Sequence, residues 1–258
     1  MNYYKAQNSE KHIMGPSSGK DAFHYFEEEQ CEVEAVDGAL NALVSQGIIA
    51  TQEYDRAAFD RFRARVKESF DIPWTGISPR MRRAIYAINA IYKPQSTVCA
   101  GIFCGYTFIC NAGASLGPGA CYESDHLIGI EILESEAKRA ANNVDRFAGG
   151  NGAAIVCADA AAWLESVCDF GVDLLYIDAK PLAFDPANPF SRGAGESEYF
   201  TIVKAAMQHL NKGALVLAHN SVNASAFLGD YLDFVRSKQF RASMNVMIDD
   251  AGLEVSIL

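Results

Sequence analysis

Short apolar runs alternate with amphipathic segments along the second half of the chain. Each run has the length of a strand buried on both faces, and each amphipathic segment has the spacing of a helix. The strands are predicted at 97–100, 127–131, 154–157, 174–177 and 214–218. The helices are predicted at about 105–115, 134–147, 160–167, 196–210 and 222–238. This alternation predicts an α/β fold with a doubly wound, mostly parallel sheet.

Two further apolar runs close the chain, near 242–248 and 253–258, and they are joined by an Asp-Asp-Ala-Gly turn. They predict an antiparallel C-terminal hairpin, which makes the sheet seven-stranded. Before the alternation begins, amphipathic patterns predict helices at about 33–45, 53–70 and 79–92. Three regions follow from this pattern: a flexible tail or lid (1–25), a helical N-terminal extension (26–94) and the sheet domain (95–258).

Composition and charge narrow the class of protein. The 258 residues carry 22 Lys and Arg against 32 Asp and Glu, a net charge of −10. An acidic chain without a basic run is not expected to bind nucleic acid. We find neither a membrane-spanning apolar stretch nor a signal peptide, so no membrane partner is expected. The seven cysteines form no Cys-x-x-Cys pair, which favours reduced thiols in a cytoplasmic protein.

The most informative chemistry lies where the first predicted sheet-domain strand ends. Gly101 and Gly105 follow that strand and precede a helix, as in a nucleotide-binding crevice. The dinucleotide pattern Gly-x-Gly-x-x-Gly is absent, because Phe103 and Phe108 stand where glycines would be needed to grip a pyrophosphate. The turn therefore favours a nucleoside without phosphates.

Polar residues follow the other strands. Glu131 ends the second strand, about thirty residues after Gly101, and suits the two hydroxyls of a ribose. Asp159 follows the third strand and is predicted either to cap the next helix or to accept from an adenine amino group. Asp178 and Lys180 follow the fourth strand, and His219 and Asn220 follow the fifth. Because the carboxyl ends of parallel strands meet at one edge, these last four residues predict a reaction centre.

Taken together, these stretches resemble catechol O-methyltransferase and its bacterial and plant relatives, which are class I S-adenosylmethionine-dependent methyltransferases. The matching stretches are 77–79 (ISP), 101–107 (GIFCGYT), 128–132 (IGIEI), 173–179 (DLLYIDA), 213–220 (GALVLAHN) and 251–257 (AGLEVSI). The resemblance implies a Rossmann-like fold, S-adenosylmethionine as cofactor and a small-molecule methyl acceptor. It implies that the cofactor is held by Ser78, Gly101, Phe103, Gly105, Tyr106, Thr107, Glu131, Ile132, Asp159, Ala160 and Asp178. A homodimer is also expected, with the N-terminal helices as a candidate pocket wall or dimer surface.

The resemblance also implies a divalent metal held by Asp178, His219 and Asn220, with Asp178, Lys180 and His219 catalytic. Three residues depart from the family pattern, one of them Lys180, which follows Asp178 by two residues where the family lysine usually follows by three. Cys99 stands where the family has an acidic residue, and His219 replaces a metal-binding aspartate. Imidazole favours ions softer than Mg²⁺. The rival hypothesis is that the metal has been lost and that His219 is a general base.

We therefore expect transfer of a methyl group to a hydroxyl of a small molecule. Two alternatives stay open from the sequence. One is metal-independent N- or C-methylation with His219 as the base, and the other is a nucleoside-binding protein without catalysis. An NAD-linked oxidoreductase is disfavoured because its glycine pattern is missing.

Overall fold

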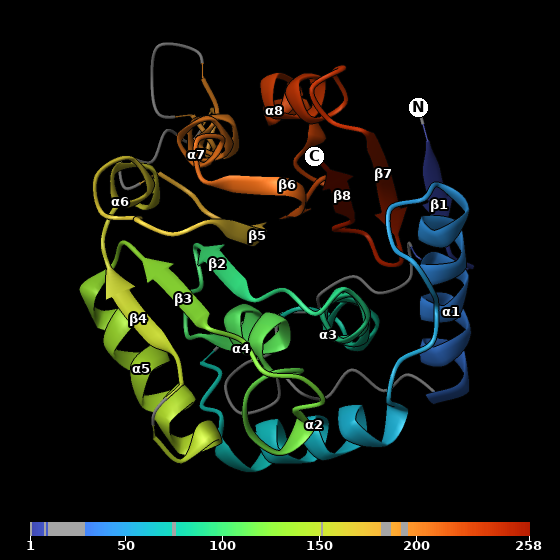
Figure 1. The fold of residues 1–258 in the computed structure, drawn as a ribbon, viewed down its shortest axis with the longest axis vertical. Helices are drawn as coiled ribbons and strands as arrows, with labels where there is room; N and C mark the ends of the chain where they lie inside the picture. The colour runs from blue at the N-terminus through green and yellow to red at the C-terminus, as the bar shows by residue number, and fades with distance from the viewer. Residues whose placement is uncertain are drawn as a thin grey trace.

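An eight-stranded sheet forms the centre of the protein (Figure 1). The computed structural model describes residues 2–7, 9, 29–73, 76–150, 152–181, 187–191 and 196–258. The strand order is β1-β7-β8-β6-β5-β2-β3-β4, and β8 alone runs antiparallel to its neighbours. The strands are β1 (Tyr3–Lys5), β2 (Ser96–Ala100), β3 (His126–Glu131), β4 (Ala154–Cys157), β5 (Val172–Ile177), β6 (Leu210–His219), β7 (Ala242–Met247) and β8 (Leu253–Ile257).

The predicted α/β fold with a mostly parallel sheet and an antiparallel C-terminal hairpin is confirmed, but the predicted number of seven strands is wrong. The additional strand is β1, which pairs in parallel with β7 at the edge of the sheet. Three residues are too few to show an alternating pattern, and β7 lies at the other end of the chain. Hydrophobic periodicity could therefore not reveal this pairing.

Helices cover both faces of the sheet (Figure 1). One apolar core lies between the sheet and the first five helices, and a second core lies between the sheet and the last three. The first group comprises α1 (Glu29–Ser45), α2 (Arg56–Ser69), α3 (Pro79–Tyr92), α4 (Tyr106–Ala112) and α5 (Glu134–Ala148). The second group comprises α6 (Ala160–Ser166), α7 (Glu198–Ala206) and α8 (Gly229–Val235). This is the three-layer arrangement of a doubly wound sheet.

The N-terminal helices join the sheet through a shared core that contains one buried ion pair. Arg83 of α3 donates from Nε to Glu32 of α1 at 2.6 Å, and both side chains are almost fully buried. Arg83 also contacts Tyr54 and lies over the ring of Phe59. A buried charge is costly unless it is paired, so this contact fixes α3 against α1. The α3 N-terminus is in turn a wall of the site described below.

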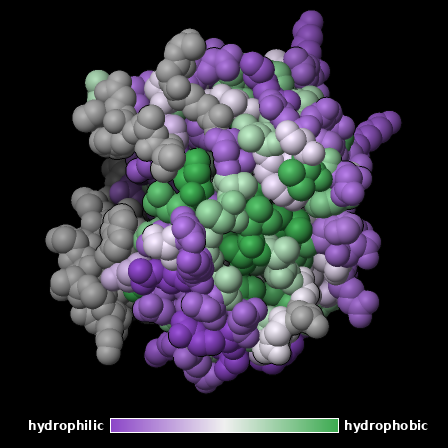
Figure 2. Space-filling model, turned by 90° about the vertical axis from the view of Figure 1, so that its left-hand side faces the viewer, coloured by the Kyte–Doolittle hydropathy of each residue, from purple (hydrophilic) through white to green (hydrophobic). Residues whose placement is uncertain are grey.

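The predicted extent of the N-terminal tail, residues 1–25, falls mostly outside the described residues. In the described part of the chain, no helix is both long and apolar enough to cross a membrane. The seven cysteines are all free thiols. Figure 2 turns the side with α6 and β4 to the viewer and shows apolar atoms in the middle of that face, with polar atoms around them.

Candidate functional site

The candidate site lies at the topological switch point of the sheet. The chain leaves β2 toward β3 and β4, and then returns to β5 on the other side of β2. The segments that follow β2 and β5 therefore leave the sheet in opposite directions, and a crevice forms between them. A cavity of about 490 Å³ occupies this position. Its wall comes from the segments that follow β2 to β7 and from the start of α3.

The glycine turn after β2 is built for close backbone approach. Gly101 has a φ of 77°, and a Cβ at this position would lie 2.5 Å from the Cα of Ala179. Gly105 has a φ of 85° and is the N-cap of α4. Between them, Phe103 adopts a positive φ of 49°, a conformation that is uncommon for a bulky residue. The turn is thus tightly folded against the loop that carries Asp178.

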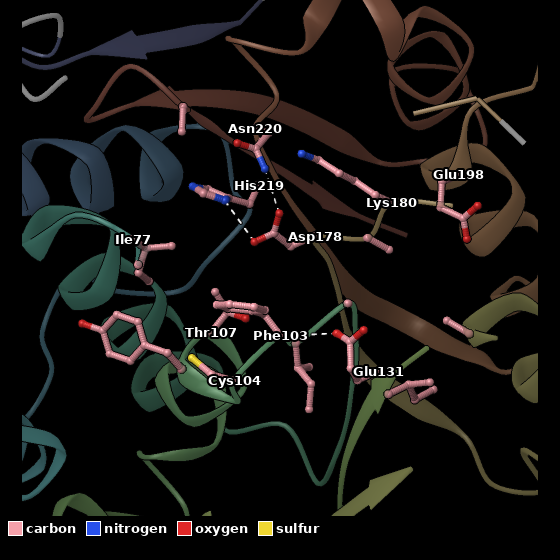
Figure 3. A pocket seen from close by; sticks show the side chains of 18 of the residues that line it. Ile77, Phe103, Cys104, Thr107, Glu131, Asp178, Lys180, Glu198, His219 and Asn220 are labelled. Carbon is pink, nitrogen blue, oxygen red and sulfur yellow. Dashed lines mark hydrogen bonds and ion pairs between the residues drawn. The ribbon is translucent and has the colours of Figure 1, made fainter. Parts of the chain in front are cut away.

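Glu131 connects the glycine turn to the end of β3. Its Oε2 accepts from the backbone N–H of Phe103 at 2.8 Å, and its Oε1 accepts from that of Leu133 at 3.0 Å (Figure 3). Burial raises the pKa of Glu131, while these backbone hydrogen bonds oppose the shift. The carboxylate is therefore held in one orientation at the cavity wall.

Two hydroxyls at the cavity wall differ in their availability. Ser78 accepts from the Met81 N–H as the cap of α3 and donates to Asp249. Thr107 is 9% exposed, and its Oγ1 has no hydrogen-bond partner among the described residues. A buried hydroxyl without a partner is costly, so Thr107 is the hydroxyl that a ligand would satisfy.

Asp178, His219 and Asn220 form one hydrogen-bonded group at the ends of β5 and β6 (Figure 3). Asp178 Oδ2 lies 3.2 Å from His219 Nδ1, and its Oδ1 accepts from Asn220 Nδ2 at 2.7 Å. His219 is 7% exposed, and its Nε2 has no partner among the described residues. The carboxylate thus favours the tautomer with the proton on Nδ1 and a free lone pair on Nε2.

The charges around His219 make it a stronger base than an isolated histidine. Burial alone would lower its pKa. Asp178 opposes this effect both by its charge and by its hydrogen bond, and Asp249 and Asp250 act in the same direction. The net result is a pKa above the ordinary value of 6.5. A raised pKa means that His219 binds a proton more readily than an isolated histidine, as suits a general base.

Lys180 and Glu198 also line the cavity. Figure 3 shows Lys180 extended toward Asn220. Its Nζ lies 5.5 Å from the centroid of the Phe190 ring. Lys180 thus lies close to the predicted reaction centre, as the sequence indicated.

The cavity wall brings together most of the residues that were predicted from sequence. They are Ser78, Gly101, Phe103, Tyr106, Thr107, Glu131, Ile132, Ala160, Asp178, Lys180, His219 and Asn220. Gly105 and Asp159 are not part of this wall. Gly105 packs against Ala140, and Asp159 caps α6 by accepting from the Ala162 N–H at 2.9 Å. Cys99 is fully buried, and burial raises the pKa of its thiol well above the ordinary value, so it packs as a neutral residue.

Among the polar residues of the wall, sequence reasoning missed four: Glu198, Asn223, Asp249 and Asp250. The last two belong to the turn between β7 and β8, which the sequence indicated only as a hairpin turn. Since β6 and β7 are both antiparallel to β8, the carboxyl ends of β6 and β7 share one edge of the sheet. That topology was the signal that could have placed Asp249 and Asp250 at the site.

Asp178, His219 and Asn220, the predicted metal ligands, present few of the oxygen donors that Mg²⁺ favours. Both oxygens of Asp178 already accept from neighbouring side chains, and the set offers one carboxylate where Mg²⁺ favours several oxygens. The described residues contain no group of three or more His, Cys, Asp or Glu side chains that could hold a metal ion. These residues therefore do not fit a resident Mg²⁺, whereas binding of a softer ion by the same residues stays a prediction.

No protein-family model and no curated protein sequence match this chain. Solved structures do resemble it. A putative O-methyltransferase from Klebsiella pneumoniae has a TM-score of 0.57 at 14% identity, over 84% of this chain and 94% of that one. An O-methyltransferase from Bacillus cereus, in complex with SAH, has a TM-score of 0.55 at 12% identity, over 88% and 99%. A putative caffeoyl-CoA O-methyltransferase from Staphylococcus aureus has a TM-score of 0.53 at 19% identity, over 86% and 98%.

The chain thus has the Rossmann-like fold of these methyltransferases. At such low identities the likeness concerns the fold, and function has to be argued from the site.

Proposed function

We propose that this protein is an S-adenosylmethionine-dependent methyltransferase that methylates a hydroxyl group of a small molecule. The observation that carries the proposal is the position of Glu131. Its carboxylate is fixed by the Phe103 and Leu133 N–H groups at the wall of the switch-point cavity, next to a glycine turn without a pyrophosphate grip. A nucleoside that has a ribose and no phosphate suits this arrangement.

The cavity residues fit this cofactor. Glu131 would accept from the ribose hydroxyls, and the unpartnered Thr107 Oγ1 would bind the polar end of the methionine portion. Ile132 and Ala160 would border the adenine ring. Gly101 leaves room that any side chain would fill. Contact between Asp159 and adenine stays a prediction, because Asp159 already caps α6.

The cofactor supplies an electrophilic methyl group on a sulfonium, which is transferred by in-line displacement. The residues of the chain then have to position the acceptor and remove its proton. His219 Nε2 is the atom that would accept the hydroxyl proton, and Asp178 holds the imidazole by its Nδ1. Asp178 also stabilises the imidazolium that forms. Lys180, at the same end of the cavity, would stabilise developing negative charge on the acceptor oxygen.

The solved structures support this chemistry over the alternatives. Those reported above are O-methyltransferases by their descriptions, and one was solved with SAH. An N- or C-methyltransferase and a non-catalytic binding protein have no such support. The homodimer also stays a prediction.

The test is methyl transfer from radiolabelled S-adenosylmethionine to a panel of small hydroxylated acceptors. We expect transfer by the wild type and a rate about 10²- to 10⁴-fold lower for His219→Ala, the usual contribution of a general base. His126→Ala is the matched control, because His126 stacks on Phe170 outside the cavity wall. Absence of transfer to every acceptor would refute catalysis, and full activity of His219→Ala would refute the role of this histidine.

A further inference from the structure

The turn between β7 and β8 places two carboxylates at the acceptor end of the cavity. Asp249 and Asp250 both line it, and so does His219 at the end of β6. Their positions follow from the parallel directions of β6 and β7. The site therefore has acidic residues near its reaction centre that the methyl transfer itself does not require.

The two carboxylates have different surroundings. Asp249 is 3% exposed, and its Oδ1 accepts from the N–H groups of Ala251 and Gly252 at 3.1 Å, while its Oδ2 accepts from Ser78. Its hydrogen bonds hold the turn against α3. Asp250 is half-buried, and its carboxylate accepts from the backbone N–H groups of Asp250 itself and of Ala251. Burial and then the charge of Asp249 raise the pKa of Asp250, and His219 lowers it. Asp250 is thus a carboxylate without a full counter-charge.

His219 supplies a second, independent indication of a ligand at this place. Its ring is almost fully buried, and Nδ1 faces Asp178, so the unpartnered Nε2 lies on the other side of the ring (Figure 3). A hydroxyl that donates to Nε2 would satisfy this atom. Asp250 lines the same cavity, and its charge acts on His219, so one small molecule can contact both residues.

The charge of the cavity wall indicates which charged group the methyl acceptor carries in addition to its hydroxyl. Five carboxylates line the cavity: Glu131, Asp178, Glu198, Asp249 and Asp250. Lys180 is the one lysine or arginine among the described lining residues. An acceptor with phosphates or carboxylates would be repelled by this wall, and the net charge of −10 adds to the effect.

From these observations, and on the basis of the function proposed above, we infer that the methyl acceptor carries a protonated amine and that Asp250 binds it. The acceptor class is a small hydroxylated amine, with the hydroxyl at His219 and the ammonium at Asp250. Asp249 is a positioning residue in this arrangement, because it holds the turn.

The experiment measures binding of three probes to the full-length protein saturated with SAH. Dopamine, 4-methylcatechol and 3,4-dihydroxyphenylacetate share a dihydroxyphenyl ring and differ in side-chain charge. We expect dopamine to bind about tenfold or more tightly than either of the others, as a charge-assisted hydrogen bond provides. Asp250→Asn should abolish this preference, and Asp250→Glu, which keeps the charge, should retain it. Asp169→Asn is the control, an exposed carboxylate outside the cavity wall.

The results separate this inference from the proposed function. Failure of the wild type to bind SAH would overturn the proposed function. If the protein binds SAH, three results would overturn the inference alone. Dopamine does not bind, dopamine binds no more tightly than the other two probes, or its preference survives Asp250→Asn. The ranking of probes by the wild type decides the matter even if a variant does not fold.

Discussion

At the scale of single residues, His219 links structure to catalysis through its protonation state. Burial lowers the pKa of His219, but the charge and hydrogen bond of Asp178, together with the charges of Asp249 and Asp250, raise it above 6.5. Below its pKa the ring carries protons on both nitrogens and cannot accept another. We expect kcat/KM to fall as the pH drops through an apparent pKa above 6.5, and we expect Asp178→Asn to move this fall to lower pH. Profiles from about pH 5 to 9 measure it, and an unshifted profile in the variant would contradict the pairing.

Glu131 is the residue on which cofactor recognition depends most. Replacement by Gln keeps its shape and removes the charge, so we expect S-adenosylmethionine affinity to fall about 10- to 100-fold, the value of one or two charge-assisted hydrogen bonds. Because burial raises the pKa of this carboxyl, wild-type affinity should also decline on acidification starting above pH 4.5. Glu134→Gln is the matched control, since Glu134 is an exposed carboxylate paired with Lys138. Equal affinities of the two variants would exclude the ribose role.

At the scale of elements, the glycine turn allows the chain after β2 to pack directly against the chain after β5. Gly101→Ala meets two penalties, a left-handed φ and a Cβ that would lie 2.5 Å from Ala179. Gly47→Ala meets only the first, because its φ is 69° and nothing lies within 4 Å. We expect a loss of about 1–2 kcal/mol for Gly47→Ala and a clearly larger loss for Gly101→Ala. Urea unfolding measures both, and equal losses would show that the close approach has no structural role.

Hydrophobic periodicity and the polar residues at strand ends predicted the longer elements, whose pattern is contained in their own sequence. The strands from β2 to β8 were all predicted, although β6 begins at Leu210, earlier than the expected 214, and Glu131 does end β3. β1 was missed because its stability comes from pairing with β7 across the whole chain. The helix predicted over 222–238 is instead a 3₁₀ turn (Ser225–Phe227) followed by α8, which starts at Gly229, a poor helix former. Asp249 and Asp250 were missed because their relation to the site depends on sheet order.

At the scale of the whole molecule, one buried ion pair joins the N-terminal helices to the sheet domain. Glu32→Ala would leave the Arg83 guanidinium buried without its main partner, and we expect a loss of about 3–5 kcal/mol. Asp37→Ala removes an exposed partner of Arg56 and should cost less than about 1 kcal/mol. The free energy of unfolding in urea compares them. If Glu32→Ala were as mild as Asp37→Ala, the pair would not fix α3 at the wall of the cavity.

The central claim is that the switch-point cavity binds S-adenosylmethionine. Isothermal titration of the purified full-length protein with S-adenosylmethionine tests it most directly. We expect one saturable site with a dissociation constant below millimolar, weakened by Glu131→Gln. No binding below millimolar concentration would contradict it.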